Sequence, residues 1–129
     1  MKKKFLYDYF ETVWNKNNPD KFGDYFHQNL TVDETQYNVE NQSTIIKREL
    51  EKVDRHFKII KIVPDENSLI VFVEVDDQFL DNIKSSLIPN LVWPAGLKIN
   101  YTRVISYRFE GEKIIEARNL VSNIGSSLL

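Results

Sequence analysis

The chain has 129 residues, an apolar share of 42%, a charged share of 28% and a net charge of −2. This length suits a single domain with one core, and the small net charge gives no general attraction to nucleic acid or to an anionic membrane. Cysteine is absent, which excludes disulfides and thiol chemistry and fits a reducing compartment. No apolar run is long enough for a membrane span or a signal peptide, so we expect a cytoplasmic protein.

Helices are expected in the first half of the chain. Apolar residues at helical spacing over 5–14 predict an amphipathic helix. The sequence Asn18-Pro19-Asp20 is typical of a new helix start, because Asn can cap a helix and Pro suits its first turn. After an extended stretch over 30–39, a third helix is predicted with Ser43 as its cap and one buried stripe of side chains: Ile46, Leu50, Val53 and Phe57.

Strands are expected in the second half. Residues 59–63 and 69–76 are rich in β-branched residues around a polar turn, and 99–110 and 113–122 flank Gly111-Glu112, so each pair predicts a hairpin. Helices followed by a meander of strands indicate an α+β fold rather than alternating β/α units, with residues 1–129 forming one domain. Residues 123–129 are expected to form a flexible tail.

The segment 77–98 is too long for a simple hairpin loop. A short helix over 79–87 is expected, followed by an apolar cluster before Gly96. Segments of this kind are either flaps that complete a core or functional lids, and both readings stay open. The side chains that a lid would use are Phe79, Ile83 and Trp93.

The two strands that carry polar residues have distinct faces, because side chains alternate along a strand. The strand over 99–110 is expected to face the core with its odd residues, which places Arg103 among aromatic side chains, where a charge needs a partner. The strand over 69–76 is apolar on both sides, so we expect it to be covered on both. Its candidate surface for a partner consists of Leu69, Val71, Val73 and Val75.

Two carboxylates on that strand, Glu74 and Asp76, point the same way. If they enter the concave side, loss of water and mutual repulsion would raise at least one pKa toward neutrality, as a general acid or base requires. Arg103 would be the compensating cation. The alternative is that they lie solvated at the mouth of the sheet. The two histidines, His27 and His56, lack ligand spacing, and no phosphate-binding loop occurs, so we expect neither metal nor cofactor.

The order of elements and two motifs resemble a known superfamily. The aromatic first helix with Trp14 is followed by Asp20, Phe22 and Tyr25-Phe26, and the chain closes on the strand pattern of residues 107–116, YRFEGEKIIE. The sequence resembles the nuclear-transport-factor-2-like superfamily, and most of all its SnoaL-like branch of polyketide cyclases, with ketosteroid isomerases and limonene-type epoxide hydrolases as relatives. The resemblance implies a cone-like, cystatin-like fold of N-terminal helices on a curved antiparallel sheet, a pocket between them, and frequent dimers through the outer sheet face.

The resemblance also implies roles for single residues. Aligned on the turn at Gly111, a frequent catalytic acid of the superfamily falls on Asn119 and a frequent histidine on Ala117. An Arg-x-Asp pair of the epoxide hydrolases falls on Glu74 and Asp76. An amide cannot act as a base, which argues against that hydrolysis here. A plain two-residue turn would turn Ala117 and Asn119 outward, whereas a bulge would turn them inward. The family alignment favours the inward arrangement.

Three functions remain open at this point. The first is an enzyme without metal or cofactor, with Asp76 as base and Glu74 as a second carboxyl group. The second is a module that binds a small apolar molecule without catalysis. The third is an interaction domain that forms a homodimer through the outer sheet face. No nucleic acid or membrane partner is expected. The pocket would be lined by Trp14, Tyr25, Phe72, Tyr101, Arg103, Tyr107 and Asn119.

Overall fold

The computed structural model describes residues 2–85 and 88–122. The first helix consists of α1 (Lys2–Tyr9) and a π-helical continuation, η1 (Phe10–Asn15), and is followed by the 3-10 helix η2 (Pro19–Asp24) and, later, by α2 (Val39–Lys52). The strands are β1 (Phe26–Val32), β2 (Thr35–Asn38), β3 (Val53–Asp65), β4 (Ser68–Phe79), β5 (Ile83–Lys84), β6 (Val92–Trp93), β7 (Lys98–Glu110) and β8 (Lys113–Ser122). The α+β prediction is confirmed, while the predicted tail over 123–129 lies outside the described residues.

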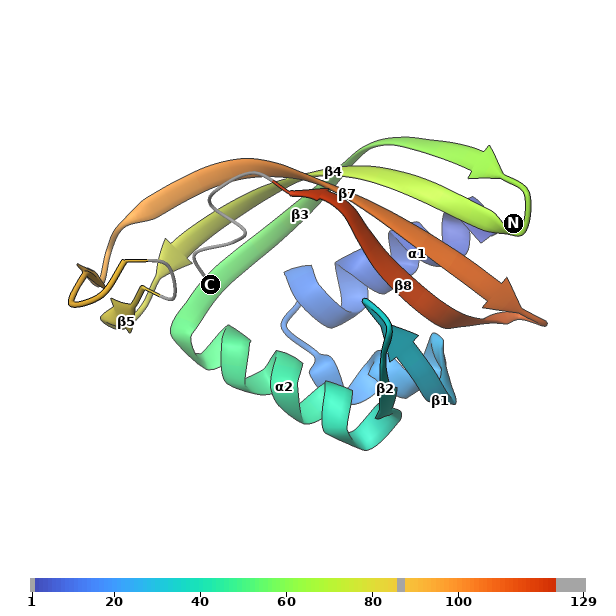
Figure 1. Cartoon of the computed structure of the whole chain (residues 1–129), viewed down its shortest axis with the longest axis horizontal. Helices are drawn as coiled ribbons and strands as arrows, with labels where there is room; N and C mark the ends of the chain where they lie inside the picture. The colour runs from blue at the N-terminus through green and yellow to red at the C-terminus, as the bar shows by residue number, and fades with distance from the viewer. Residues whose placement is uncertain (1, 86–87, 123–129) are drawn as a thin grey trace.

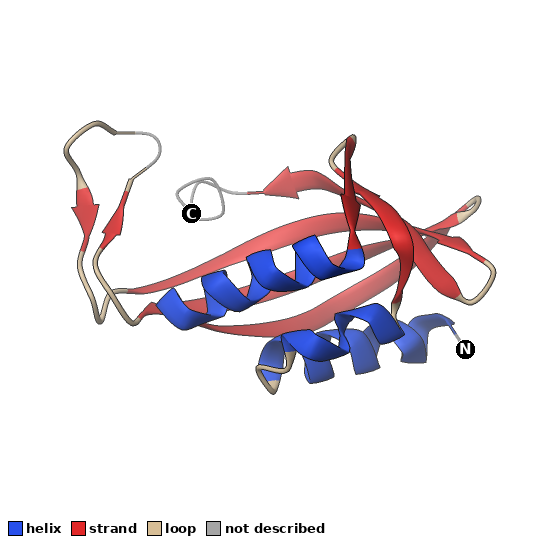
Figure 2. Cartoon of the chain, turned by 90° about the horizontal axis from the view of Figure 1, so that it is seen from below, coloured by secondary structure: helices blue, strands red, loops and turns tan. Residues whose placement is uncertain are grey.

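Six strands form one curved sheet in the order β2-β1-β8-β7-β4-β3. The sheet arches over the helices, and α1 and α2 lie across its concave face (Figures 1 and 2). The sheet is mixed rather than wholly antiparallel as predicted, because β1 pairs with β8 in parallel. Periodicity within single strands does not determine how two strands from opposite ends of the chain run relative to each other.

The boundaries of α2 differ from the prediction at both ends. Asn38 caps the helix, with its Oδ1 accepting a hydrogen bond from the backbone N of Asn41 at 2.7 Å. Ser43 instead lies inside the helix and donates its hydroxyl to the carbonyl of Pro19 at 2.7 Å. Val53 and Phe57 belong to β3, on its buried side. A spacing of four residues keeps side chains on one face of either a helix or a strand, which is why the helical stripe was extended too far.

The core lies between the concave face of the sheet and the helices. Val71, Val73 and Val75 have exposed fractions of 0% and belong to this core, with Leu69 packed against it. The prediction that these four residues form an outer interface is therefore wrong. The outer face of β4 carries Phe72, which lies opposite Val104 of β7, together with Ile70. Association of two copies through the outer face stays a prediction.

The long segment after β4 forms a small flap. Its two short strands, β5 and β6, pair Ile83 with Trp93, where a short helix was predicted. Phe79 closes β4 and is 1% exposed, while Leu87 lies outside the described residues. The flap projects from one end of the molecule and joins the C-terminal end of α2, where the backbone N of Leu80 donates to the carbonyl of Lys52 at 2.8 Å (Figure 2). Among the described helices, none has the length and apolar character needed to cross a membrane.

Candidate functional site

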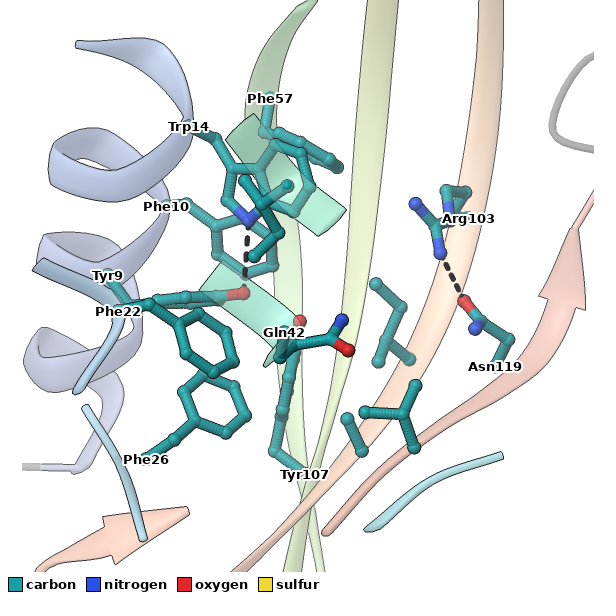
Figure 3. A pocket seen from close by; sticks show the side chains of 14 residues that line it. Tyr9, Phe10, Trp14, Phe22, Phe26, Gln42, Phe57, Arg103, Tyr107 and Asn119 are labelled. Atoms are coloured by element: carbon teal, nitrogen blue, oxygen red, sulfur yellow. Dashed lines mark hydrogen bonds between the residues drawn. The ribbon is translucent and has the colours of Figure 1, made fainter. Parts of the chain in front are cut away.

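A cavity of about 80 Å³ lies between the first helix, the first turns of α2 and the concave faces of β7 and β8 (Figure 3). Because about 10–15 Å³ of such space holds one water molecule, the cavity has room for several waters or for a few heavy atoms. Pockets for drug-sized ligands are several times larger, at about 300–1,000 Å³. The cavity is lined by Tyr9, Phe10, Trp14, Phe22, Phe26, Val32, Gln42, Ile46, Phe57, Arg103, Ile105, Tyr107, Ala117 and Asn119.

Aromatic rings fill most of the cone and thereby set the size of the cavity. Phe22 and Phe26 stack with ring centroids 4.1 Å apart. Trp14 meets Phe57 edge to face at 5.1 Å. Such pairs contribute roughly 0.5–1.5 kcal/mol each beyond their burial, so this side of the cavity is a rigid apolar wall.

Two tyrosine hydroxyls lie within this aromatic wall. The indole Nε1 of Trp14 donates a hydrogen bond to the hydroxyl of Tyr9 at 3.0 Å. Burial raises the pKa of Tyr9 well above its ordinary value, and the Trp14 hydrogen bond and the Arg103 charge offset only part of this rise. Burial likewise raises the pKa of Tyr107. Both phenols therefore stay protonated at neutral pH, when they can donate hydrogen bonds but cannot serve as bases.

The opposite side of the cavity is polar. Arg103 Nη2 donates to Asn119 Oδ1 at 2.5 Å, and Asn119 in turn donates its Nδ2 to Asp33 Oδ2 at 2.7 Å. Gln42 reaches from α2 into the space between the aromatic wall and the Arg103–Asn119 pair (Figure 3). Gln42 Oε1 and Arg103 Nε are buried and have no hydrogen-bond partner among residues 2–85 and 88–122. An occupant of the cavity would therefore find one free acceptor and one free donor.

The chemistry available to the cavity follows from this lining. Its polar side chains are an arginine, two protonated tyrosines, a glutamine and an asparagine, which between them donate and accept hydrogen bonds. No carboxylate or imidazole is among the described lining residues. The arrangement can hold a polar group and stabilise negative charge on an oxygen, but it offers no side chain that would remove a proton near neutral pH.

Four of the residues predicted to line the pocket do so together: Trp14, Arg103, Tyr107 and Asn119. The other three lie elsewhere. Tyr25 packs against Phe5, with ring centroids 5.1 Å apart, and Phe72 is on the outer face of the sheet. Tyr101 is buried in another part of the concave face, where its hydroxyl donates to Asp77 Oδ2 at 2.8 Å.

The two carboxylates predicted as catalytic do not enter the concave side. Asp76 is exposed on the outer face and accepts a hydrogen bond from Asn100 Nδ2 at 2.6 Å, and Glu74 lies on that same face. The inward carboxylate of this strand is the next residue, Asp77, which is 3% exposed. It accepts two hydrogen bonds from Arg55, at 2.9 and 3.0 Å. Asp77 is thus fully engaged by its neighbours and does not line the cavity.

A bulge decides the register of the last strand. The turn at Gly111 is tight, with a positive φ of 64°, and pairs Phe109 with Ile114 as predicted. The register then shifts at Ile115, so that Ala117 lies opposite Tyr107 and Asn119 opposite Ile105. Both therefore face inward, where the family alignment had placed them.

Three residues of the site are not among the predicted ones: Tyr9, Gln42 and Asp33. Tyr9 lies within residues 5–14, whose spacing indicates only an apolar helix face. Gln42 precedes Ile46 by four residues, so a polar side chain on the buried stripe of α2 was a usable signal. Asp33 lies in the β1–β2 turn, and its contact with Asn119 joins segments 86 residues apart, which no local pattern indicates.

Known proteins resemble this chain in fold but not in sequence. No family model matches the sequence, and no curated protein is similar to it in sequence. Among solved structures, a SnoaL-like polyketide cyclase from Agrobacterium tumefaciens superimposes with a TM-score of 0.77 at 16% identity, covering 95% of this chain and 91% of that one.

Two further structures show the breadth of the likeness. A hypothetical protein with a ketosteroid isomerase-like fold from Catenulispora acidiphila, in complex with trimethylamine, gives a TM-score of 0.72 at 16% identity, over 98% of this chain and 89% of that one. An epoxide hydrolase of the LEH-like type from M. tuberculosis gives 0.64 at 11% identity, over 90% and 74%. At such identities the likeness is one of fold. The chain therefore has the fold of these SnoaL-like and ketosteroid isomerase-like structures.

Proposed function

We propose that the protein binds a small, mostly apolar molecule in the cone cavity, with the polar end of the molecule at Arg103 and Gln42. The observation that carries this proposal is the pair of buried polar atoms, Arg103 Nε and Gln42 Oε1, that have no hydrogen-bond partner in the part of the chain that the structure describes. A buried donor or acceptor left unpaired costs about 1–3 kcal/mol. An occupant that satisfies both atoms while its apolar part contacts the aromatic wall gains from both kinds of interaction.

The size of the cavity limits the ligand to a few heavy atoms. A ligand of five heavy atoms needs about 0.8 kcal/mol per atom to reach a Kd of about 1 mM, which is within the ceiling of about 1.5 kcal/mol per atom for very small ligands. Millimolar or somewhat tighter binding is thus attainable. A polycyclic molecule would require the aromatic wall to move.

Binding is favoured here over acid–base catalysis by Glu74 and Asp76. Those two side chains lie on the outer face of the sheet, separated from the cavity by β4 itself. The polyketide cyclase and epoxide hydrolase activities named for the similar structures belong to those proteins. For this chain, the neutral and cationic hydrogen-bond donors of the cavity favour a role in holding a ligand.

The proposal can be tested with the cavity's own tryptophan. In a Trp93→Phe background Trp14 is the sole tryptophan and reports directly on the cavity. Three- to five-carbon amides, ketones and carboxylic acids are titrated while fluorescence and Tm are followed. At ten times Kd, binding adds about 1.4 kcal/mol of stability, enough to raise Tm by roughly 3–6 °C.

A variant that fills the cavity provides the specificity control. Ala117→Leu adds three carbon atoms inside the cavity and should abolish both the fluorescence change and the Tm shift. Ala95→Leu makes the same change at an exposed site in the flap and should leave both intact. The proposal fails if none of the compounds produces a response in the parent protein, or if Ala117→Leu responds as strongly as the parent does.

A further inference from the structure

We propose that the ligand of this cavity carries a carboxylate group, and that Arg103 is the residue that selects it. This inference rests on the proposed function and makes it specific, since it names the chemical class of the ligand's polar end. It depends on how the charge of Arg103 is compensated, on which of its donors are free, and on how its position is held.

Arg103 differs from the other arginines of the sheet. Arg55, Arg108 and Arg118 form ion pairs with Asp77, Glu116 and Glu34, at 2.9, 3.1 and 2.8 Å. Within residues 2–85 and 88–122, no carboxylate pairs with Arg103, whose side-chain partner is the neutral amide of Asn119. A half-buried cation beside an apolar wall favours an anion as its partner, because the wall cannot replace the lost water.

The free donors of Arg103 have the arrangement that a carboxylate uses. A guanidinium has five N–H donors and can hold both oxygens of a carboxylate at once. Arg55 provides the example within the same protein, because its Nε and Nη2 donate to the two oxygens of Asp77. In Arg103 the corresponding Nε has no partner among the described residues, and Nη2 gives one of its two N–H groups to Asn119.

The charge of Arg103 is felt across the cavity. Burial is the main cause that raises the pKa of Tyr9 and of Tyr107, and the positive charge of Arg103 opposes that rise in both. Its field therefore reaches the hydroxyls on the aromatic side. An anion in the cavity would lie between this cation and two phenols that remain hydrogen-bond donors.

Asn119 and Asp33 act as positioning residues for Arg103. Asp33 accepts hydrogen bonds from both the backbone N and the Nδ2 of Asn119, each at 2.7 Å, and its own backbone N donates to the carbonyl of Ala117 at 3.0 Å. Asp33 and Glu34 form the β1–β2 turn with positive φ angles of 49° and 72°. Positive φ at both positions is usual in a two-residue hairpin turn, and Asp tolerates it, so the turn holds Asp33 beside Asn119.

The test compares ligands that differ only in charge or in their apolar part. Propionate and propionamide have nearly the same shape, and nitrate is a planar anion without an apolar tail. Each is titrated against the Trp93→Phe protein in a low-chloride buffer. We expect propionate to bind at least tenfold more tightly than propionamide, and more tightly than nitrate.

Variants then assign the preference to residues. Arg103→Met removes the donors that either ligand would use, so both should bind more weakly, but the loss should be about tenfold greater for propionate and should bring the propionate-to-propionamide ratio to about one. Asn119→Asp places a carboxylate beside Arg103 and should lower the ratio several-fold. Asp33→Asn retains a residue that tolerates the left-handed turn but weakens the clamp on Asn119, so a smaller fall in the ratio is expected.

The possible failures are distinguishable. Equal binding of propionate and propionamide by the parent protein overturns the carboxylate inference and leaves the proposed function standing. Equal binding of nitrate and propionate means that the site takes inorganic anions, which also overturns it. If Arg103→Met weakens propionate and propionamide by the same factor, Arg103 supplies a hydrogen bond without selecting charge, which also overturns the inference. No binding of any of the three overturns the inference, and the proposed function falls with it only if the ketones and the larger amides and acids also fail to bind.

Discussion

Two arginines on the concave face of the same sheet have opposite surroundings. Arg55 of β3 is 4% exposed, donates two hydrogen bonds to Asp77 and contacts Glu49 at 3.1 Å. Arg103 of β7 has a neutral amide as its side-chain partner, and its buried Nε has no partner within the described ranges of the chain. Carboxylates of the protein neutralise the charge of Arg55, whereas Arg103 has N–H donors left for a ligand.

The comparison indicates which part of the cone is structural and which part is available for binding. At Arg55 the hydroxyl of Tyr101 also donates to Asp77, so both carboxylate oxygens are occupied. The Arg55 guanidinium lies 5.9 Å from the ring of Trp14, which in turn donates to Tyr9. The Arg55–Asp77 ion pair thus supports the aromatic wall of the cavity, but neither of its residues lines the cavity.

The largest expected effect on stability comes from breaking the Arg55–Asp77 ion pair. Asp77→Asn leaves the Arg55 charge buried with only the exposed Glu49 as an anionic partner, and should destabilise the protein by about 3–5 kcal/mol. Asp76→Asn is a matched control one residue away, on the exposed face, with an expected change within about 0.5 kcal/mol. Urea unfolding of both variants measures the difference. Similar values for the two would mean that the Arg55–Asp77 pair contributes little.

Asp76 and Asp77 also show what the sequence could not predict, which is the face of this strand that is buried. The strand over 69–76 is apolar on both faces, so alternation alone could not tell which face meets the helices. Once Val71 and Val75 are known to face inward, parity turns Asp76 outward and Asp77 inward. Arg103 was placed correctly because the alternate face of its own strand is polar. The strand assignments of both hairpins succeeded for the same reason, since their periodicity is local.

The size of the cavity was beyond prediction for a different reason. Residues 5–14 predict an aromatic helix, but the volume left between rings depends on how Phe10, Trp14 and Phe57 pack across three elements. The inward position of Asn119 required a bulge at Ile115 that strand patterns do not indicate. The alignment with the SnoaL-like branch supplied that placement.

The next effect concerns three buried phenols of the concave side, those of Tyr9, Tyr101 and Tyr107. Burial raises the pKa of Tyr9, Tyr101 and Tyr107 above the ordinary value near 10. Above pH 10 the unfolded chain loses these protons while the folded protein keeps them, so the unfolded state binds fewer protons and stability must fall as pH rises. The expected slope is up to about 1.4 kcal/mol per pH unit for each tyrosine.

Urea unfolding between pH 9 and pH 11 checks this slope. Tyr107→Phe should reduce it by the share of one phenol. Tyr7→Phe, at an exposed side chain, is the control for simply removing one phenol from the unfolded chain. A free energy of unfolding that stays flat or rises above pH 10 would contradict the proposed burial of these hydroxyls.

The smallest expected effect on stability is that of replacing Arg103. Arg103→Met removes a cation that has no carboxylate partner among the described residues, so the loss of its hydrogen bond to Asn119 is offset by relief of an uncompensated charge. The change should lie within about 0.5 kcal/mol. Arg55→Met, the same substitution at the ion-paired arginine, leaves Asp77 buried without its cation and should lower the free energy of unfolding by about 3–5 kcal/mol. Equal losses in the two variants would mean that Arg103 is also a structural residue. A stable Arg103→Met protein that no longer prefers propionate would separate the two roles, because one arginine would then affect folding and the other binding.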